Sequence, residues 1–295
     1  MRSKALSLLI LIVMLSIAAC APQATAAPTA TNVPVAATAT TAPTPTEVPA
    51  TATVKPTTLT VLAAASLTES FTELGTLFES QNPGVTVVLS FAGSQALAEQ
   101  LAQGAEADVF ASANVKYMTA AVDSQRVNEA DAKTFATNRL IVIYPKENPA
   151  SLTELQDLAN AGLKLDLADQ AVPVGQYSLD FLDKAVADPA FDPQFKENVL
   201  ANVVSYEENV KAVVTKVSLG EADAGIVYVT DITADAASKV GTIEIPDELN
   251  TIATYPIAPI ANSTNADLAN AFVTLVFSQE GQDILAKYGF IPAVQ

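Results

Sequence analysis

The sequence contains no histidine and only one cysteine among its 295 residues. Without histidine, Ser–His and Cys–His catalytic pairs and zinc–histidine centres are excluded. Cys20 has no second cysteine with which to form an intramolecular disulfide. A hydrolase that works through two carboxylates stays open because there are 32 acidic residues, but none stands in a recognisable catalytic motif. These absences favour a binding protein over an enzyme.

Basic residues are also scarce. Lysine and arginine together number 15, and the formal net charge is −17. Cleavage before Cys20 would remove Arg2 and Lys4 and bring the charge to −19. Beyond that point the arginines are Arg126 and Arg139. Because no basic patch exists to displace counterions, nucleic acid is not expected as a partner, and the acidity is better explained by solubility.

The first 20 residues are typical of an export signal. Arg2 and Lys4 precede an apolar run over 6–19, which is short for a permanent membrane-spanning helix. The run ends Ile17-Ala-Ala-Cys20 and resembles a bacterial lipobox, in which the signal is cut before the cysteine and the cysteine carries lipid. We therefore expect residues 1–19 to be a lipoprotein signal peptide and Cys20 to be the anchor.

The next segment differs sharply in composition. Of residues 21–57, 29 are Thr, Ala or Pro, and only Glu47 and Lys55 are charged. Such a segment buries too little apolar surface to offset its chain entropy. Residues 20–57 are therefore predicted to be a lipidated cysteine followed by a flexible tether, with or without sugars on its threonines.

Residues 58–295 alternate short apolar runs with helical spacing. Strands are expected at 59–63, 85–89, 108–111, 140–144, 163–167 and 225–229, with an edge or crossover strand at 255–260 because of its prolines. Helices are expected near 67–78, 97–101, 151–161, 177–186, 210–217, 265–277 and 279–288. This alternation predicts α/β lobes with mostly parallel sheets.

Six short pieces together resemble the periplasmic molybdate-binding proteins of ABC importers, from about residue 59 to 292. They are Ala63-Ala-Ala-Ser-Leu67, Phe91-Ala-Gly-Ser94, Ala107-Asp-Val-Phe-Ala-Ser112, Val172-Pro-Val-Gly175, Gly225-Ile-Val-Tyr228 and Lys287-Tyr-Gly-Phe290. The resemblance implies a type II two-lobe periplasmic-binding-protein fold, with the ligand cleft between the lobes and two crossover segments. The implied division is 58–137 plus 258–295 for lobe 1 and 138–257 for lobe 2.

The same resemblance implies an oxyanion site made of five residues. Ser66 and Ser94 would supply hydroxyl and backbone N–H groups, Tyr228 a phenol, and Val174 and Val210 backbone N–H groups. The family often has serine where this chain has Gly93, and a smaller residue where it has Val174.

The expected positions of these residues relative to helix starts independently favour anion binding. Ser66, Ser94, Val174 and Val210 each fall at or just before the start of an expected helix, where unpaired N–H groups and partial positive charge attract anions. Structural alternatives exist for three positions. Ser66 with Glu69 fits a helix-capping box, Ser94 fits an N-cap, and Tyr228 fits a core tyrosine.

The function expected is high-affinity binding of molybdate or tungstate and delivery to an ABC permease by a lipid-anchored, extracytoplasmic monomer. It would have no enzymatic activity and would need no cofactor. It would bind no metal as a free cation, only molybdenum or tungsten in the form of the oxyanion. The alternatives are a binding protein for another tetrahedral oxyanion, such as sulfate or a phosphonate, and an anchored protein that keeps the fold without transport. The sequence does not separate molybdate from tungstate.

Overall fold

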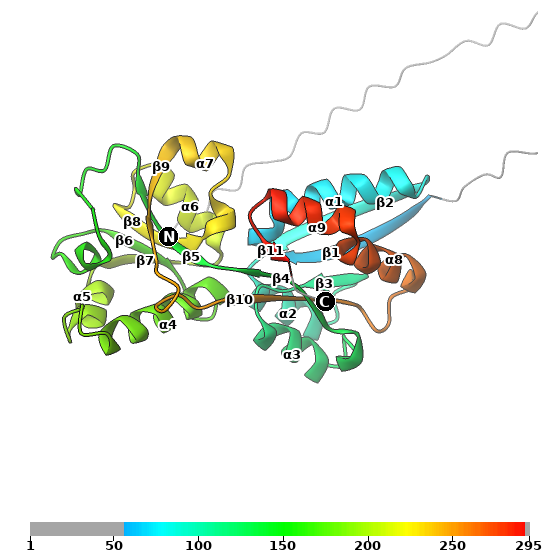
Figure 1. The fold of residues 1–295 in the computed structure, drawn as a ribbon. Coiled ribbons are helices and arrows are strands. Elements are labelled where there is room, and N and C mark those ends of the chain that lie inside the picture. The colour runs from blue at the N-terminus through cyan, green and yellow to red at the C-terminus, as the bar shows by residue number, and fades with distance from the viewer. Residues whose placement is uncertain (1–55, 293–295) are drawn as a thin grey trace, which may run out of the picture. The chain divides into compact units, whose positions relative to one another are not determined.

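The computed structural model describes residues 56–292, which form two α/β lobes, each built on its own sheet (Figure 1). The predicted signal peptide, Cys20 and nearly all of the tether lie outside these residues. Within the described range, no helix is both long and apolar enough to cross a membrane. The predicted two-lobe α/β fold is confirmed.

The first lobe contains a six-stranded sheet in the order β11-β4-β10-β3-β1-β2. β1 pairs in parallel with β2 and β3, whereas β10 runs antiparallel to β3 and β4. The strands are β1 (Thr57–Ala64), β2 (Val85–Ala92), β3 (Val109–Ala111), β4 (Lys133–Asn138), β10 (Ala253–Pro259) and β11 (Ile291–Pro292).

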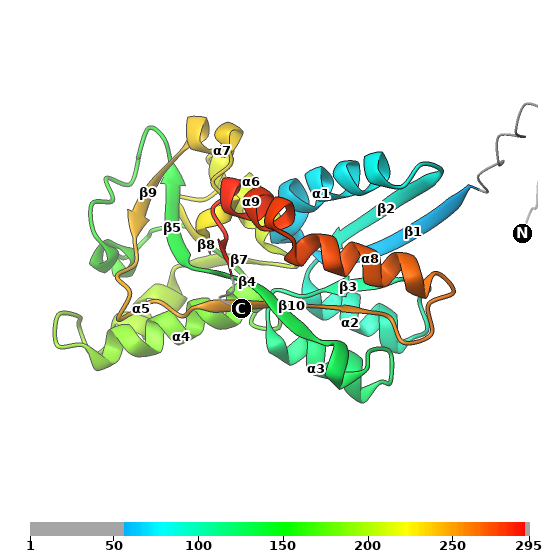
Figure 2. The same ribbon diagram turned by 45° about the vertical axis from the view of Figure 1, so that its right-hand side comes forward.

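Helices cover both faces of this sheet (Figure 2). α1, α8 and α9 contact one another on one face, and α2 and α3 pack together on the other. Alternate residues of β1 serve the two sides, because Val61 belongs to the core with Phe71 and Phe272, and Leu62 to the core with Leu97. The helices are η1 (Ala65–Leu67), α1 (Thr68–Gln81), α2 (Ser94–Ala102), α3 (Val115–Asp123), η2 (Glu129–Asp131), α8 (Ala266–Phe277) and α9 (Gln279–Lys287).

The second lobe contains a five-stranded sheet in the order β7-β6-β8-β5-β9. Its strands are β5 (Leu140–Pro145), β6 (Leu165–Ala168), β7 (Val203–Glu207), β8 (Ala224–Tyr228) and β9 (Val240–Glu244). α4 and α5 pack together on one side of it and α6 and α7 on the other. The helices are η3 (Leu155–Ala159), α4 (Pro173–Ala187), α5 (Phe195–Ala201), α6 (Val210–Ser218), η4 (Val229–Asp231) and α7 (Ala234–Lys239).

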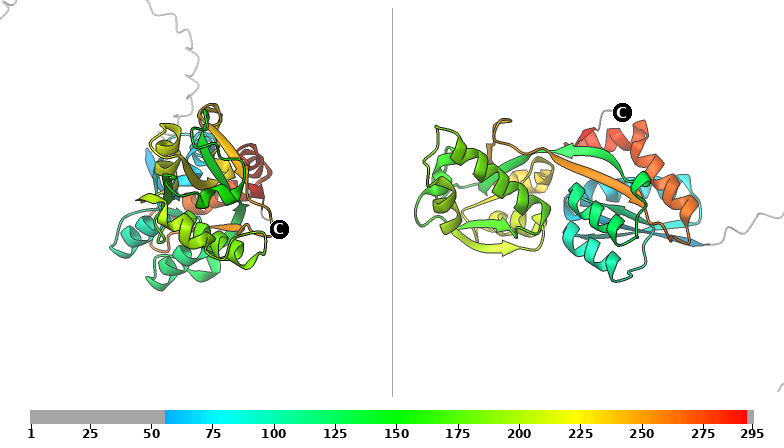
Figure 3. Two further views of the ribbon diagram at one scale, coloured as in Figure 1. Left: turned by 90° about the vertical axis from the view of Figure 1, so that its left-hand side faces the viewer. Right: turned by 90° about the horizontal axis from the view of Figure 1, so that it is seen from below.

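The chain crosses between the sheets through β4–β5 and through the approach to β10 (Figure 3). Arg139 alone separates β4 from β5. β10 spans the predicted lobe boundary at 257/258, and it pairs with β4 of the first sheet from Ala253 onward. Asn138, the last residue of β4, donates from Nδ2 to the Thr230 hydroxyl at 2.8 Å and so ties the crossing to the second lobe.

The sequence left open whether 255–260 is an edge or a crossover strand. β10 is the crossover strand, because it lies between β4 and β3, with a register shift between Tyr255 and Pro256 where the proline lacks an N–H. Two other predictions of local structure were wrong. The sheets are mixed rather than mostly parallel, because β10 and β11 in the first lobe and β5 in the second pair antiparallel with their neighbours. The helix expected near 151–161 is only the 3₁₀ segment η3. Leu155 and Leu158 in η3 and Leu152 just before it are buried and recur every three residues, which is the period of a 3₁₀ helix.

Candidate functional site

The first-lobe wall of the site begins where two parallel strands end together. In the register of β1 and β2, Ala64 pairs with Ala92. Two residues beyond each of these alanines stands a serine, Ser66 in η1 and Ser94 at the first position of α2. Parallel pairing therefore places both serines at the same edge of the sheet.

Ser66 is buried, and its Oγ lies 2.9 Å from the Tyr255 hydroxyl oxygen. That tyrosine oxygen also accepts a hydrogen bond from Asn138 Nδ2 at 3.3 Å. When Tyr255 donates to Ser66, the Ser66 proton remains available for a ligand. Burial is the largest effect on Tyr255 and raises its pKa far above the ordinary value, so it remains a neutral donor.

The capping box expected from Ser66 and Glu69 does not form. α1 begins at Thr68 with Leu67 as its N-cap, and no side chain caps it. The Ser66 hydroxyl turns to Tyr255 instead, and Glu69 pairs with Lys211.

Ser94 is buried and sits one residue inside α2, whose N-cap is Gly93. It is therefore not the N-cap considered as an alternative. Its Oγ accepts the backbone N–H of Ala113 at 3.0 Å. Because that bond uses only a lone pair, the Ser94 proton is left to donate to a ligand.

The second-lobe wall is formed by helix starts. β6 runs parallel to β7 and to β8, so the segments that follow all three strands leave the same edge of the sheet. Val174 is the second residue of α4, after Pro173, and Val210 is the first residue of α6. Their N–H groups have no acceptor within their own helices. Each helix start also adds partial positive charge.

Gly175 lets α4 start close to the end of β6. A Cβ at this position would lie 2.1 Å from the carbonyl oxygen of Asp169 and 2.5 Å from that of Ala168. The glycine of the Val-Pro-Val-Gly piece is thus required by packing against backbone, which fixes where the Val174 N–H lies.

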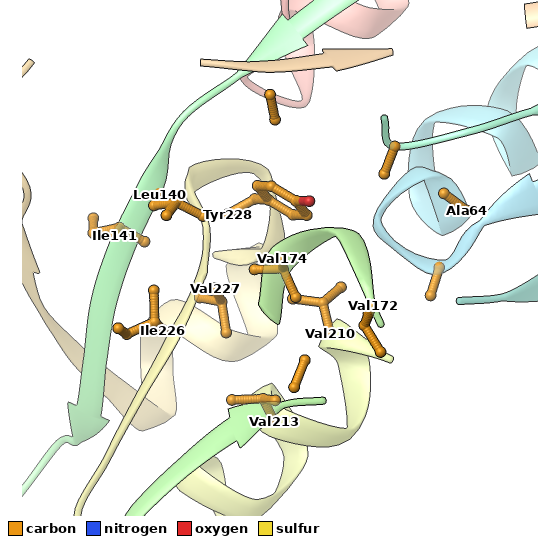
Figure 4. Close-up of a cluster of buried hydrophobic side chains, with 14 of the residues drawn as sticks. Ala64, Leu140, Ile141, Val172, Val174, Val210, Val213, Ile226, Val227 and Tyr228 are labelled. Carbon is orange, nitrogen blue, oxygen red and sulfur yellow. The ribbon is translucent and has the colours of Figure 1, made fainter. Parts of the chain in front are cut away.

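Tyr228 ends β8, and its ring lies beside aliphatic side chains such as Val174 (Figure 4). Its ring centroid lies 5.9 Å from that of Tyr255 and 6.5 Å from that of Tyr177. The Tyr228 hydroxyl is buried and has no hydrogen-bond partner within residues 56–292. Burial, followed by the neighbouring tyrosines and Asp231, raises its pKa well above the ordinary value. A buried hydroxyl without a hydrogen-bond partner destabilises the folded state. A ligand that accepts its proton would supply the missing partner.

All five predicted ligand residues line one small cavity between the lobes. No charged side chain is among the lining residues, which are Ala64, Ala65, Ser66, Ala92, Gly93, Ser94, Ala113, Val172, Pro173, Val174, Asn209, Val210 and Tyr228. A cavity lined by hydroxyl and amide donors and by no carboxylate suits a fully ionised oxyanion, which only accepts hydrogen bonds. Among residues 56–292, no group of three or more potential metal-ligating side chains exists.

One lining residue escaped sequence reasoning. Asn209 is the N-cap of α6, and its Oδ1 accepts the N–H of Ala212 at 3.1 Å. The cap fixes the side chain and leaves its amide N–H₂ able to donate toward a ligand. An asparagine directly before an amphipathic valine helix is a recognisable cap signal, so this residue was within reach of the sequence.

Comparison with known proteins gives a consistent result. The model of the bacterial extracellular solute-binding protein family matches residues 59–291. The chain belongs to this family. It is 36% identical to the molybdate-binding protein ModA of Mycobacterium tuberculosis strain H37Rv over 232 residues, which cover 79% of this chain and 84% of the relative.

Solved structures share the fold. The substrate-binding domain of a putative molybdenum ABC transporter from Clostridium difficile is similar, with 26% identity and a TM-score of 0.60 over 81% of this chain and all of that one. The sulfate-binding protein SubI of Mycobacterium tuberculosis is similar in fold, with 20% identity and a TM-score of 0.71 over 80% of this chain and 87% of that one.

Membership of the extracellular solute-binding family places the chain's work outside the cytoplasm. The relatives are binding proteins rather than enzymes.

Proposed function

We propose that this solute-binding protein captures molybdate or tungstate in the cavity between its lobes and passes it to an ABC permease. The observation that carries the proposal is the convergence of neutral donors from both lobes, with the Tyr228 hydroxyl buried and unpaired. The ligands proposed are Ser66, Ser94, Val174, Val210 and Tyr228. The similarity to molybdate-binding proteins supports the choice of anion.

The donor chemistry separates candidate anions. Phosphate at neutral pH still carries a proton, which needs an acceptor, and the cavity walls contain no carboxylate. Molybdate, tungstate and sulfate carry no proton, so size decides among them. The sulfate-binding alternative is supported only by a shared fold. We therefore expect strong binding of molybdate and tungstate, weak binding of sulfate and weaker binding of phosphate.

Calorimetric titration of the full-length protein with the four anions tests this order. Molybdate and tungstate should also raise the melting temperature, because a ligand at 100 times its Kd adds about 2.7 kcal/mol to the stability of the folded state. Equal affinity for sulfate would replace the proposal with that of a sulfate-binding protein. No binding of any of the four would overturn the proposal and leave a phosphonate-binding protein or an anchored protein without a transport role.

The remaining features of the proposal follow from the sequence. Cys20 would carry the lipid that holds a monomer at the membrane surface, with residues 21–57 as the tether and lobes at 58–137 plus 258–295 and at 138–257. The protein would act as no enzyme and need no cofactor. Membrane fractionation of Cys20→Ser checks the anchor, since the variant should become soluble and keep its affinity for the anion.

A further inference from the structure

Three charged side chains meet beside the cavity and join the two lobes. Lys211 Nζ lies 2.8 Å and 3.0 Å from the two carboxylate oxygens of Glu69, and 3.2 Å from Asp231 Oδ1. Glu69 belongs to α1 of the first lobe, whereas Lys211 in α6 and Asp231 in η4 belong to the second. In the part of the chain that the structure describes, Lys211–Glu69 is the one ion pair that links the lobes.

The two halves of this cluster differ in what lobe separation would do to them. Asp231 is fully buried in the second lobe, where its Oδ2 accepts the Tyr228 N–H at 3.1 Å. Lys211 therefore keeps Asp231 when the lobes part, but it must leave Glu69. Burial disfavours the lysine charge, yet Asp231 and Glu69 outweigh burial and hold the Lys211 pKa above its ordinary value. The lysine thus stays charged and ready to pair.

The cluster is coupled to the site by chain connectivity. Lys211 directly follows Val210, Glu69 comes three residues after Ser66, and Asp231 comes three residues after Tyr228. Neutral hydrogen bonds also link the lobes, from Gln95 Nε2 to the Glu208 carbonyl at 2.8 Å and from the Tyr117 hydroxyl to the Ala171 carbonyl. Both of these hydrogen bonds are exposed, whereas the Lys211–Glu69 pair is partly buried, so water screens the charged pair less.

We propose that the Lys211–Glu69 ion pair is a latch that forms when the lobes close and that slows release of the bound anion. The inference rests on the proposed function. A simpler role is conceivable, in which Lys211 attracts the anion through its charge alone. The two roles make opposite predictions for Glu69. A latch needs its carboxylate, whereas simple attraction improves when that negative charge is removed.

The experiment measures the rate at which the full-length protein releases radiolabelled molybdate into excess unlabelled molybdate. The variants are Lys211→Met, Glu69→Gln and the double variant. Two matched controls remove a paired lysine charge within a single lobe. Lys216→Met breaks the pair with Glu207 in the second lobe, and Lys287→Met breaks the pair with Glu73 in the first.

For a latch, both single variants release molybdate about five to ten times faster than wild type, and the double variant is no faster than either single variant. Both controls stay within about twofold. Lys211→Met leaves the buried Asp231 without its cation and can lower stability. Glu69→Gln keeps Lys211–Asp231 intact, so it tests the latch even when Lys211→Met fails to fold. Melting temperatures report this separately.

Release from Glu69→Gln at the wild-type rate or more slowly would overturn the latch while the proposed function stands. If both control variants also released molybdate faster, the change in net charge alone would explain the faster release, and the latch would be overturned as well. Failure of the wild-type protein to bind molybdate, seen before any variant is made, would overturn the proposed function itself and this inference with it.

Discussion

The two walls of the cavity achieve the same electrostatic result by different means. The first-lobe wall offers two serine hydroxyls. Ser66 shares a hydrogen bond with the Tyr255 hydroxyl, and the Ser94 oxygen accepts the Ala113 N–H. The second-lobe wall offers mainly backbone N–H groups at the starts of α4 and α6, near Val174 and Val210. A side-chain donor can be deleted by a conservative substitution, whereas a backbone donor survives almost any substitution. The two walls should therefore respond differently to mutation.

The largest loss is expected from deleting one side-chain donor on each wall. Ser94→Ala and Tyr228→Phe each remove a hydroxyl and keep most of the bulk. A hydrogen bond to a charged group contributes roughly 1.5–3 kcal/mol, so each variant should lose about one to two decades in Kd. The double variant should lose about two to four decades if the sites act independently. Calorimetry with molybdate measures this.

Wild-type affinity in the double Ser94→Ala, Tyr228→Phe variant would show that the anion binds elsewhere. Ser66→Ala is a less clean test, because the serine oxygen also contacts Tyr255. Melting temperatures of the empty variants serve as the control, and for Tyr228→Phe stability should hold or rise because an unpaired hydroxyl is removed.

The backbone wall can be broken only by removing an N–H group. Val210 is the first residue of α6, where proline fits the helix and lacks the donor. The preceding Asn209 is extended, with φ −160° and ψ 165°, which a following proline tolerates. Val210→Pro should therefore weaken molybdate binding by about one to two decades.

Val210→Ala is the matched control for the proline variant. It keeps the N–H group and removes buried methyls, so it should cost stability, about 1–3 kcal/mol, but change Kd by less than about threefold. Equal affinities of the alanine and proline variants would remove Val210 from the ligand set.

Much of the cavity lining was predictable from sequence, because the proposed donors lie at or after strand ends in short, recognisable pieces. Ser94 and Val174 follow β2 and β6 within six residues, Tyr228 ends β8, and parallel pairing gathers such positions. The partner of Ser66 was not predictable, because Tyr255 is 189 residues away and meets it only through the order of the first sheet. The choice between an edge and a crossover strand at β10 stayed open for a similar reason, since local proline content does not reveal a register shift.

A smaller effect is expected at the rim where the lobes approach. Gly93 was interpreted from sequence only as a missing hydroxyl. A Cβ there would lie 2.4 Å from the Gln95 side-chain amide, which is flexible, and 2.5 Å from the Glu208 backbone carbonyl oxygen of the other lobe. Gly93→Ala should therefore hold the cleft slightly open and weaken binding on the order of tenfold, the range of a typical overpacking cost.

Gly75→Ala is the control for this rim. It also adds a methyl to a first-lobe glycine, but its Cβ would meet only side chains of the same lobe, Leu89 at 3.3 Å and Val87 at 3.5 Å. Calorimetry measures the molybdate affinity of both variants. Unchanged affinity of Gly93→Ala would mean that the residues around position 93 shift to accept the methyl without opening the cleft.

The smallest effect on binding should come from a buried carboxylate outside the site. Asp166 in β6 is fully buried, and neither of its oxygens has a hydrogen-bond partner in the described range. Its counterpart in the first lobe, Asp108, is satisfied by the Thr60 N–H at 2.7 Å and by the Ser263 hydroxyl at 2.5 Å. The buried carboxylate of the first lobe is thus hydrogen-bonded and that of the second lobe is not. Asp→Asn is therefore expected to change stability in opposite directions at the two positions.

Burial, reinforced by Glu207, raises the pKa of Asp166 from 3.8 to about 7. The folded state then holds its proton more tightly than the unfolded state, so this group's contribution to stability is fully present below pH 3.8 and is lost as pH rises to about 7. Wild type loses this contribution as the pH rises, whereas Asp166→Asn cannot. The free energy of unfolding of Asp166→Asn minus that of wild type should therefore increase from pH 5 to pH 8, by up to about 3 kcal/mol. Asp108→Asn should lose stability at both pH values.

Denaturant unfolding at pH 5 and pH 8 measures the stability of both variants. A stability difference between Asp166→Asn and wild type that stays constant with pH would show that the Asp166 charge is already stabilised in the folded protein. Molybdate affinity should be unchanged in Asp166→Asn, because the residue lies outside the cavity lining.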